Sequence, residues 1–208
     1  VNTARLSILL LTFTLVTTVA RPEQTASFVS SLQPAGILPE SLQREVDAAI
    51  DGGLDWLSAK QKDDGSWSNG DFPALTALPL WAFAQAKHPR KPAVERAAIR
   101  YILSCAQENG GIYKHVEGRK GGGLSNYNTA ICMTALHATG RADVRSAVLK
   151  ARSFVSASQY TGDDEYRGGF GYDPSTKRAY TDLLNTYYAS QAMRQTASSE
   201  EFRPTSEK

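Results

Sequence analysis

A short pattern that occurs three times constrains this chain more than any other feature. A glutamine is followed by a glycine and an aromatic residue, first as Gln61, Gly65 and Trp67 in "QKDDGSWSNGDFP". The same offsets recur in "QENGGIY", and the pattern returns with a longer acidic loop in "QYTGDDEYRGGFGY", which gives Gln107, Gly111, Tyr113, Gln159, Gly169 and Phe170. Repeats at this spacing usually correspond to stacked supersecondary units that bury their apolar faces against one another.

Each glutamine follows a segment with helical periodicity. In the first segment, apolar residues recur every three or four positions, as at Val46, Ile50, Leu54 and Leu57, which is typical of an amphipathic helix. The segments before the other two glutamines show the same stripe. Residues 73–86, 127–139 and 180–193, after the three loops, are candidate second helices. The sequence therefore predicts an all-α chain of six main helices in three antiparallel hairpins.

The residues of the pattern are predicted to be structural. Glycine allows a tight or left-handed backbone where a helix ends, and a glutamine amide can bond loop backbone groups. A large aromatic side chain can cover the junction, so Trp67 is predicted to join successive helical hairpins. Aligned on the glutamines, the first helices match at Trp56, Ile102 and Phe154, and the second helices are in register at Thr76, Thr129 and Thr181.

The 208 residues divide into four predicted parts: a signal peptide (1–20), a linker (21–40), the three-repeat segment (41–197) and a polar tail (198–208). Arg5 precedes an apolar run that ends in Thr18 and Ala20, which suit a cleavage site for export. This run is shorter than the roughly 20 residues of a spanning helix, although an uncleaved anchor is the alternative. The sequence predicts an exported protein, periplasmic or extracellular, with no transmembrane span in the mature chain.

The composition is that of an ordinary globular protein, with 41% hydrophobic and 21% charged residues. A net charge of +2 gives no reason to expect nucleic acid as a partner. Cys105 and Cys132 could pair in an oxidising compartment, or Cys105 could fill a small buried position as a free thiol. No Cys-x-x-Cys or Cys–His spacing suggests zinc, so neither a metal nor a cofactor is expected.

With these motifs the chain resembles the glutamine–tryptophan repeat of the prenyltransferase and squalene-cyclase superfamily, from roughly Ser41 to Thr196. The segment "GGFGYDPSTKRAYTDLLNTYYASQAM" is similar to exported bacterial repeat proteins of that superfamily. The resemblance implies an α/α toroid, in which two concentric rings of helices surround a central cavity. Three hairpins would make about half of such a ring.

The resemblance does not extend to the catalytic and zinc-binding motifs of the superfamily's enzymes. The acidic Asp-x-Asp-Asp-Thr-Ala cluster of the cyclases and the Asp, Cys and His zinc set of the prenyltransferases have no counterpart in this sequence. Asp182 stands where the other repeats have alanine, which makes it the one candidate acid or ligand-binding carboxylate. The alternative is that Asp182 caps the first turn of a helix. The acidic run Asp163–Glu165 is interpreted as a solvated loop or a weak cation site, and His88, His115 and His137 are interpreted as structural.

Two classes of function follow. The first is a non-catalytic toroid-family module that binds a partner or an apolar ligand. The second is the N-terminal half of a terpene-cyclase-like, prenyltransferase-like or other toroid enzyme whose catalytic residues lie outside this chain. In either class the third hairpin lacks a neighbour, so the sequence predicts self-association or further C-terminal repeats that cover Leu183, Leu184, Tyr187 and Tyr188.

Overall fold

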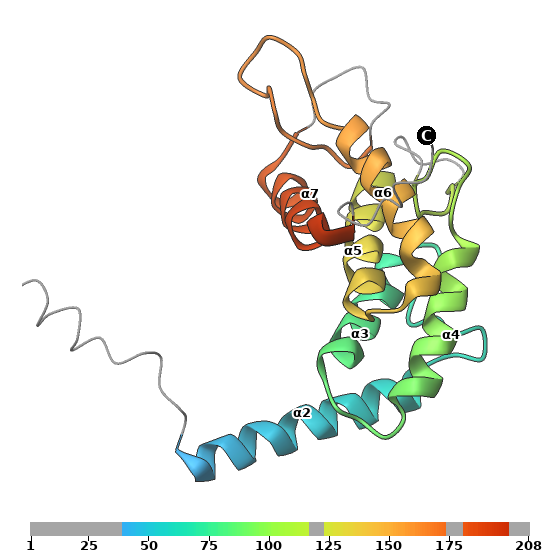
Figure 1. Cartoon of the computed structure of the whole chain (residues 1–208), viewed down its shortest axis with the longest axis vertical. Coiled ribbons are helices and arrows are strands. Elements are labelled where there is room, and N and C mark those ends of the chain that lie inside the picture. The colour runs from blue at the N-terminus through green and yellow to red at the C-terminus, as the bar shows by residue number, and fades with distance from the viewer. Residues whose placement is uncertain (1–38, 117–122, 174–180, 200–208) are drawn as a thin grey trace, which may run out of the picture. The chain divides into compact units, whose positions relative to one another are not determined.

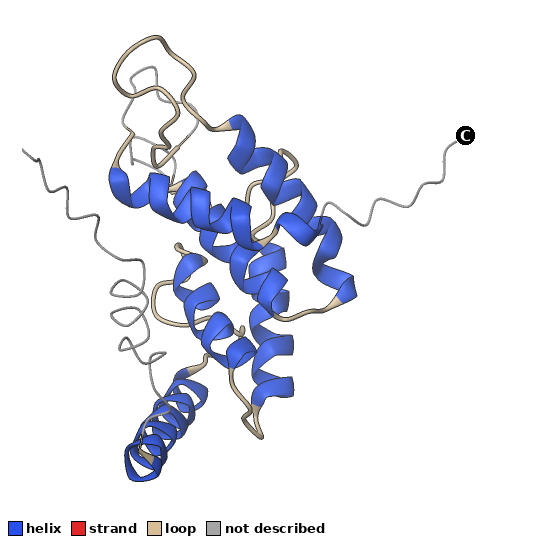
Figure 2. Ribbon diagram, turned by 60° about the vertical axis from the view of Figure 1, so that its left-hand side comes forward, coloured by secondary structure: helices blue, strands red, loops and turns tan. Residues whose placement is uncertain are grey.

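The computed structural model describes residues 39–116, 123–173 and 181–199. Within these ranges the chain forms six α-helices and two short 3-10 helices, with isolated β-bridges and no strand (Figure 2). The elements are α2 (Glu40–Lys60), α3 (Ala74–Gln85), α4 (Lys91–Ser104), α5 (Ser125–Ala138), η1 (Ala142–Val144), α6 (Arg145–Ala157), α7 (Leu183–Gln195) and η2 (Ala197–Ser199). The prediction of an all-α chain with six main helices is confirmed.

The terminal predictions largely lie outside the described residues. The signal peptide (1–20) and almost all of the linker (21–40) precede Pro39, and most of the polar tail (198–208) follows Ser199. Within the described ranges, no helix has the length and apolar character that a membrane crossing needs. The helical core belongs to the second of two compact units, Val1–Glu45 and Val46–Lys208.

The centre of this core is α5. Every residue from Asn128 to Leu136 is buried, and α5 packs against α3, α6 and α7 (Figure 1). A helix that is buried all round must satisfy its polar side chains internally. Thr129 and Thr134 do so by donating to the carbonyl oxygens of Ser125 and Ala130, one turn earlier.

The first helices of the repeats differ in how much of their apolar stripe is covered. The stripes of α4 and α6 are buried as predicted, through Val94, Ala98 and Ile102 in α4 and Val148, Ala151 and Val155 in α6. In α2 only Leu54 is buried. The predicted stripe of α2 therefore faces solvent for most of its length, because the described chain places no earlier repeat against it.

The helices also pair differently from the prediction. The most extensive contact joins α3 to α5, the second helices of successive repeats; among helices consecutive in the chain, the most extensive contacts join α3 to α4 and α5 to α6, across the short connections between repeats. Of the three predicted hairpins, α6 with α7 shows limited contact, whereas α4 and α5 make little direct contact. The loops between the predicted partners are long, whereas a short connection makes consecutive helices neighbours. The helices are therefore as predicted, but the predicted pairing of each first helix with the second helix of its own repeat is wrong.

Candidate functional site

The first repeat loop joins three helices. Nε2 of Gln61 donates to the carbonyl oxygens of Gly65 and of Val94 in α4, both at 3.1 Å. Trp67 is only 4% exposed, and its indole Nε1 donates to the carbonyl oxygen of Leu57 in α2 at 2.8 Å. The predicted pattern residues thus bridge the end of α2 to α4.

A glycine at position 65 is required by two features. Its φ of +90° is unfavourable for residues with a side chain, and a Cβ at this position would lie 2.3 Å from the carbonyl oxygen of Ala97. The main chain of α4 can therefore rest directly on the loop only because residue 65 is glycine.

The second loop repeats this geometry one residue earlier than the sequence alignment predicted. The backbone N–H of Gln107 donates to the carbonyl oxygen of Gly111, as that of Lys62 donates to Ser66. Gly110 has a φ of +89°, and its Cβ would lie 2.6 Å from the carbonyl oxygen of Lys150 in α6. The structural counterparts of Gln61, Gly65 and Trp67 are thus Ala106, Gly110 and Ile112, and the predicted Gln107, Gly111 and Tyr113 are each one position late.

The loss of the glutamine leaves a gap in the second junction. Where Gln61 reaches Val94, the second repeat has Ala106, whose short side chain cannot reach the equivalent Ala147 of α6. A cavity of about 250 Å³ between this loop and α6 is lined by Ala106 and Ala147 among others. This cavity follows from the local sequence and needs no ligand to explain it.

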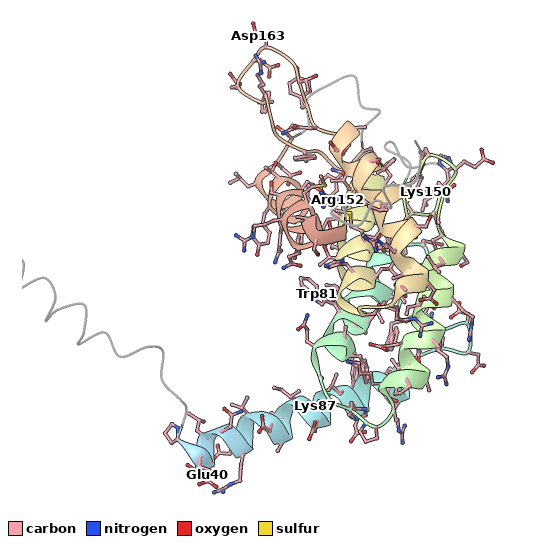
Figure 3. The ribbon with its side chains drawn as sticks, viewed as in Figure 1. Glu40, Trp81, Lys87, Lys150, Arg152 and Asp163 are labelled. Atoms are coloured by element: carbon pink, nitrogen blue, oxygen red, sulfur yellow. The ribbon has the colours of Figure 1, made fainter. Side chains whose placement is uncertain are left out.

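The third loop has the same turn despite its acidic insertion. Gln159 Nε2 donates to the carbonyl oxygen of Gly168 at 2.9 Å, and Gly168 has a φ of +86°. The predicted Gln159 and Phe170 are in the structural register, whereas the predicted Gly169 is one residue late. Asp163 lies at the far end of this loop (Figure 3). The insertion is tied back by Asp164, which accepts from the Tyr160 hydroxyl at 2.8 Å.

A threonine hydroxyl fixes each loop to its second helix. The backbone N–H groups of Trp67, Ile112 and Phe170 donate to Oγ1 of Thr76, Thr129 and Thr186, at 3.2, 2.8 and 3.0 Å. The third threonine is Thr186, not the predicted Thr181. The signal for it was present, because "NT" occurs at residues 128–129 and again at 185–186.

Asp182, the candidate catalytic carboxylate, occupies the N-cap of α7. One oxygen accepts from the backbone N–H of Asn185 at 2.9 Å, and the other accepts from the Asn185 side-chain amide at 2.6 Å. Both oxygens therefore bond at the helix start, which is the capping role that the sequence offered as the alternative.

A buried arginine that the sequence gave no reason to single out connects α6 to the end of α7. Arg152 (Figure 3) donates from Nη1 to the carbonyl oxygen of Met193 at 2.7 Å and to Oγ1 of Thr196 at 2.5 Å. Carbonyl groups at a helix C-terminus attract a positive charge. Arg152 therefore stabilises the position of α7 on α6.

The remaining titratable candidates do not converge on one place. Cys105 and Cys132 are buried free thiols, and burial raises the pKa of each, most strongly that of Cys132. Burial also lowers the pKa of His137 on α5. His88 lies 3.3 Å from Asp55 and packs its ring edge-on against Phe83. Among the described residues, no group of three or more His, Cys, Asp or Glu side chains could hold a metal ion.

Three exposed apolar side chains of the third repeat lie at the start of α7. Leu183 is 90% exposed, and Leu184 and Tyr187 are also exposed, as the sequence predicted for the side without a neighbour. Tyr188 is instead half-buried. Its ring packs edge-on against Tyr127 of α5 at 5.4 Å between centroids, and burial raises the pKa of Tyr127.

Comparison of the chain with known protein-family models, with curated proteins and with solved structures finds no match.

Proposed function

We propose that this chain is an exported helical-repeat module of the prenyltransferase and squalene-cyclase type that works by binding a protein partner. The observation that carries the proposal is the loop that recurs three times with the same turn, glycine and threonine hydrogen bond. Such recurrence is what a stack of equivalent units requires.

The packing of the second helices supports a toroid-like arrangement. α5 packs against both α3 and α7, so the second helices of successive repeats are neighbours, as they would be in an inner ring. α4 and α6 each rest on a loop glycine of the preceding repeat, which is the position expected of an outer ring.

The polar residues of the repeat have structural partners, which favours a binding role over catalysis. The amides of Gln61 and Gln159 bond loop carbonyl groups, and Asp182 caps α7. The exposed residues Leu183, Leu184 and Tyr187 offer an apolar contact surface instead. A surface of this kind on a folded protein commonly marks an interface.

The accessibility of this surface can be tested with the dye 1-anilinonaphthalene-8-sulfonate at low protein concentration. We expect the chain to enhance the dye fluorescence, and the double variant Leu184→Ser, Tyr187→Ser to lose most of that enhancement. Tyr166→Ser, which changes an exposed tyrosine of the third loop, is the matched control and should keep it. No enhancement, or equal enhancement in the double variant, would mean that the α7 surface is already covered, and the binding role would have to be abandoned.

A further inference from the structure

The first and second repeat loops each contact the main chain of the first helix of the following repeat. In the first junction, the carbonyl oxygen of Ala97 in α4 lies against Gly65, which is buried. In the second, the carbonyl oxygen of Lys150 in α6 lies against Gly110, which is also buried. In both junctions, the main chain of the first helix of the following repeat therefore rests on the loop glycine.

In the third loop, the equivalent glycine has no helix backbone packed against it among the described residues. Gly168 adopts the same positive φ as Gly65 and Gly110, yet it is exposed. A Cβ on Gly168 would meet only Nε2 of Gln159, at 3.9 Å. The turn is thus built for a helix backbone that approaches closely, as in the other two junctions.

The start of α7 is uncovered as well. The threonines Thr186, Thr129 and Thr76 align the second helices. The exposed residues Leu183, Leu184 and Tyr187 then correspond to Asn126, Tyr127 and Ala130 in α5, and to the N-cap Pro73 with Ala74 and Ala77 at the start of α3. All of these equivalents are buried or half-buried. Gly168, Leu183, Leu184 and Tyr187 together are called the trailing face.

Helix α2, by contrast, has no preceding repeat loop packed against it among the described residues. Aligned on the loops, Trp56 corresponds to Tyr101 in α4 and Phe154 in α6. The equivalents are 6% and 8% exposed, whereas Trp56 is 61% exposed. Gly53 corresponds to Ala98 and Ala151, which are both fully buried, yet a Cβ on Gly53 would meet nothing within 4 Å.

Helix α3, the second helix of the first repeat, is uncovered in the same way. Leu78 and Ala82 on α3 are exposed, whereas their equivalents in α5, Ile131 and Ala135, are buried. Leu78 and Ala82 line a shallow pocket of about 350 Å³ together with Trp81 and Gln85. Gly53, Trp56, Leu78 and Ala82 together are called the leading face.

We propose that a second copy of this chain docks head to tail, with its leading face on the trailing face of the first copy. Each face lacks what the other supplies, because α4 and α6 show within one chain how a first helix sits on a preceding loop. Such a contact is heterologous, so it joins unlike surfaces of identical chains. The inference rests on the proposed binding function and names its partner.

Two neighbouring lysine substitutions test the contact. Gly53→Lys places a long cation where α4 and α6 have a buried alanine, whereas Gly52→Lys copies Lys150, whose side chain is exposed in α6. Neither position has an atom within 4 Å of a new Cβ, so neither change should disturb the isolated chain. We expect Gly53→Lys to weaken association by at least about tenfold, because a buried unpaired cation costs more than the ~1.4 kcal/mol that this factor represents. Gly52→Lys should associate like the unchanged chain.

The measurement is sedimentation equilibrium of the full chain over roughly 1 to 100 μM, where micromolar contacts form and dissociate. Acidic residues stand close in sequence to residues of both faces, at Asp51, Asp55 and Asp163–Glu165. The buffer should therefore hold about 150 mM salt, which limits their repulsion to about 8 Å. A chain that stays monomeric throughout, or a Gly53→Lys variant that associates like Gly52→Lys, would overturn the proposal. A monomeric chain that still binds the dye at α7 would leave the binding function intact and remove only the second copy as its partner.

The direction of docking is tested by cross-linking. By analogy with Gln61 and Val94, Gln159 of one copy should lie beside Ala49 of the other. A mixture of Ala49→Cys and Gln159→Cys chains should give a dimer with a short thiol-to-thiol cross-linker, while each variant alone should give little. The native Cys105 and Cys132 are buried and should not react. Equal dimer from either variant alone would contradict head-to-tail docking.

Discussion

The backbone N–H of Phe170 donates to the hydroxyl of Thr186, 3.0 Å away. The same bond joins Ile112 to Thr129 in the second repeat and Trp67 to Thr76 in the first. An apolar residue just after the loop glycine is thereby fixed to the first turns of its second helix in all three repeats. This bond, more than the identity of the aromatic residue, defines the repeat.

Replacing the buried tryptophan should be far more damaging than replacing the exposed one. Trp67→Ala removes a core aromatic and the bond from Nε1 to Leu57, which should lower the free energy of unfolding by about 3–5 kcal/mol. Trp56→Ala is the matched control and should change it by less than about 0.5 kcal/mol in the dissociated chain. Urea unfolding followed by circular dichroism, at low protein concentration, measures both. Equal small changes would show that Trp67 is a surface residue.

The three loop glycines should differ in their tolerance of alanine. Gly168→Ala should cost about 1–2 kcal/mol from its positive φ alone. Gly65→Ala meets the Ala97 carbonyl in addition and should cost about 1–3 kcal/mol more. Gly140, which also has a positive φ but open space around it, provides a control for backbone strain. Thermal or urea unfolding that ranks Gly65→Ala with Gly140→Ala would show that the α4 main chain does not rest on residue 65.

Much of the helical architecture follows from the sequence, because helical periodicity and the positions of glycine and proline are local properties. The alignment of the loops does not. The doublets Gly110–Gly111 and Gly168–Gly169 each allow two registers, and only the backbone φ and the bonds across the turn decide between them. Because Gln107 was aligned with Gln61, the predicted residues of the second loop are one position late.

Helix pairing is also not a local property. The choice of α3 with α4, rather than α4 with α5, depends on which loop is long enough to separate its flanking helices. The exposure of the α2 stripe depends on a neighbour that no pattern within α2 can reveal. The N-cap role of Asp182 was predictable in kind, since an acidic residue before an apolar helical segment commonly caps it.

Glu95 should make stability depend on pH. Burial raises its pKa above the ordinary value of 4.5, and the nearby Lys91 and Arg141 only partly offset this. The folded chain thus binds the Glu95 proton more tightly than the unfolded chain, so the stability from this group is present below the unfolded pKa and is lost as the pH rises through the folded pKa.

Glu95→Gln removes this loss. The variant should be more stable than the unchanged chain at about pH 7, and the difference should shrink at about pH 4, where the carboxyl is mostly protonated in both states. The measurement is urea unfolding at the two pH values, with Glu108→Gln at an exposed position as the control. A Glu95→Gln variant that is less stable at the higher pH would show that the charged carboxylate is favourable where it lies.

Export is tested on the protein produced in a Gram-negative host. The apolar run Leu6–Ala20, with Thr18 and Ala20 at its end, predicts cleavage after Ala20. N-terminal sequencing of the periplasmic fraction should begin at or near Arg21. An intact N-terminus on protein confined to the cytoplasm would refute the signal peptide.

Residue-resolved amide hydrogen exchange tests the equivalence of the three loops most directly. The amides of Trp67, Ile112 and Phe170 should exchange slowly compared with loop amides such as that of Glu108, because each is bonded to a threonine hydroxyl. Thr129→Val should accelerate exchange at Ile112 and cost about 1–3 kcal/mol, since a buried N–H loses its partner, while Thr129→Ser should preserve the protection. Protection at all three amides, removed at Ile112 by valine but not by serine, is the predicted result. Fast exchange at Ile112 or Phe170 in the unchanged chain would contradict the three-repeat account.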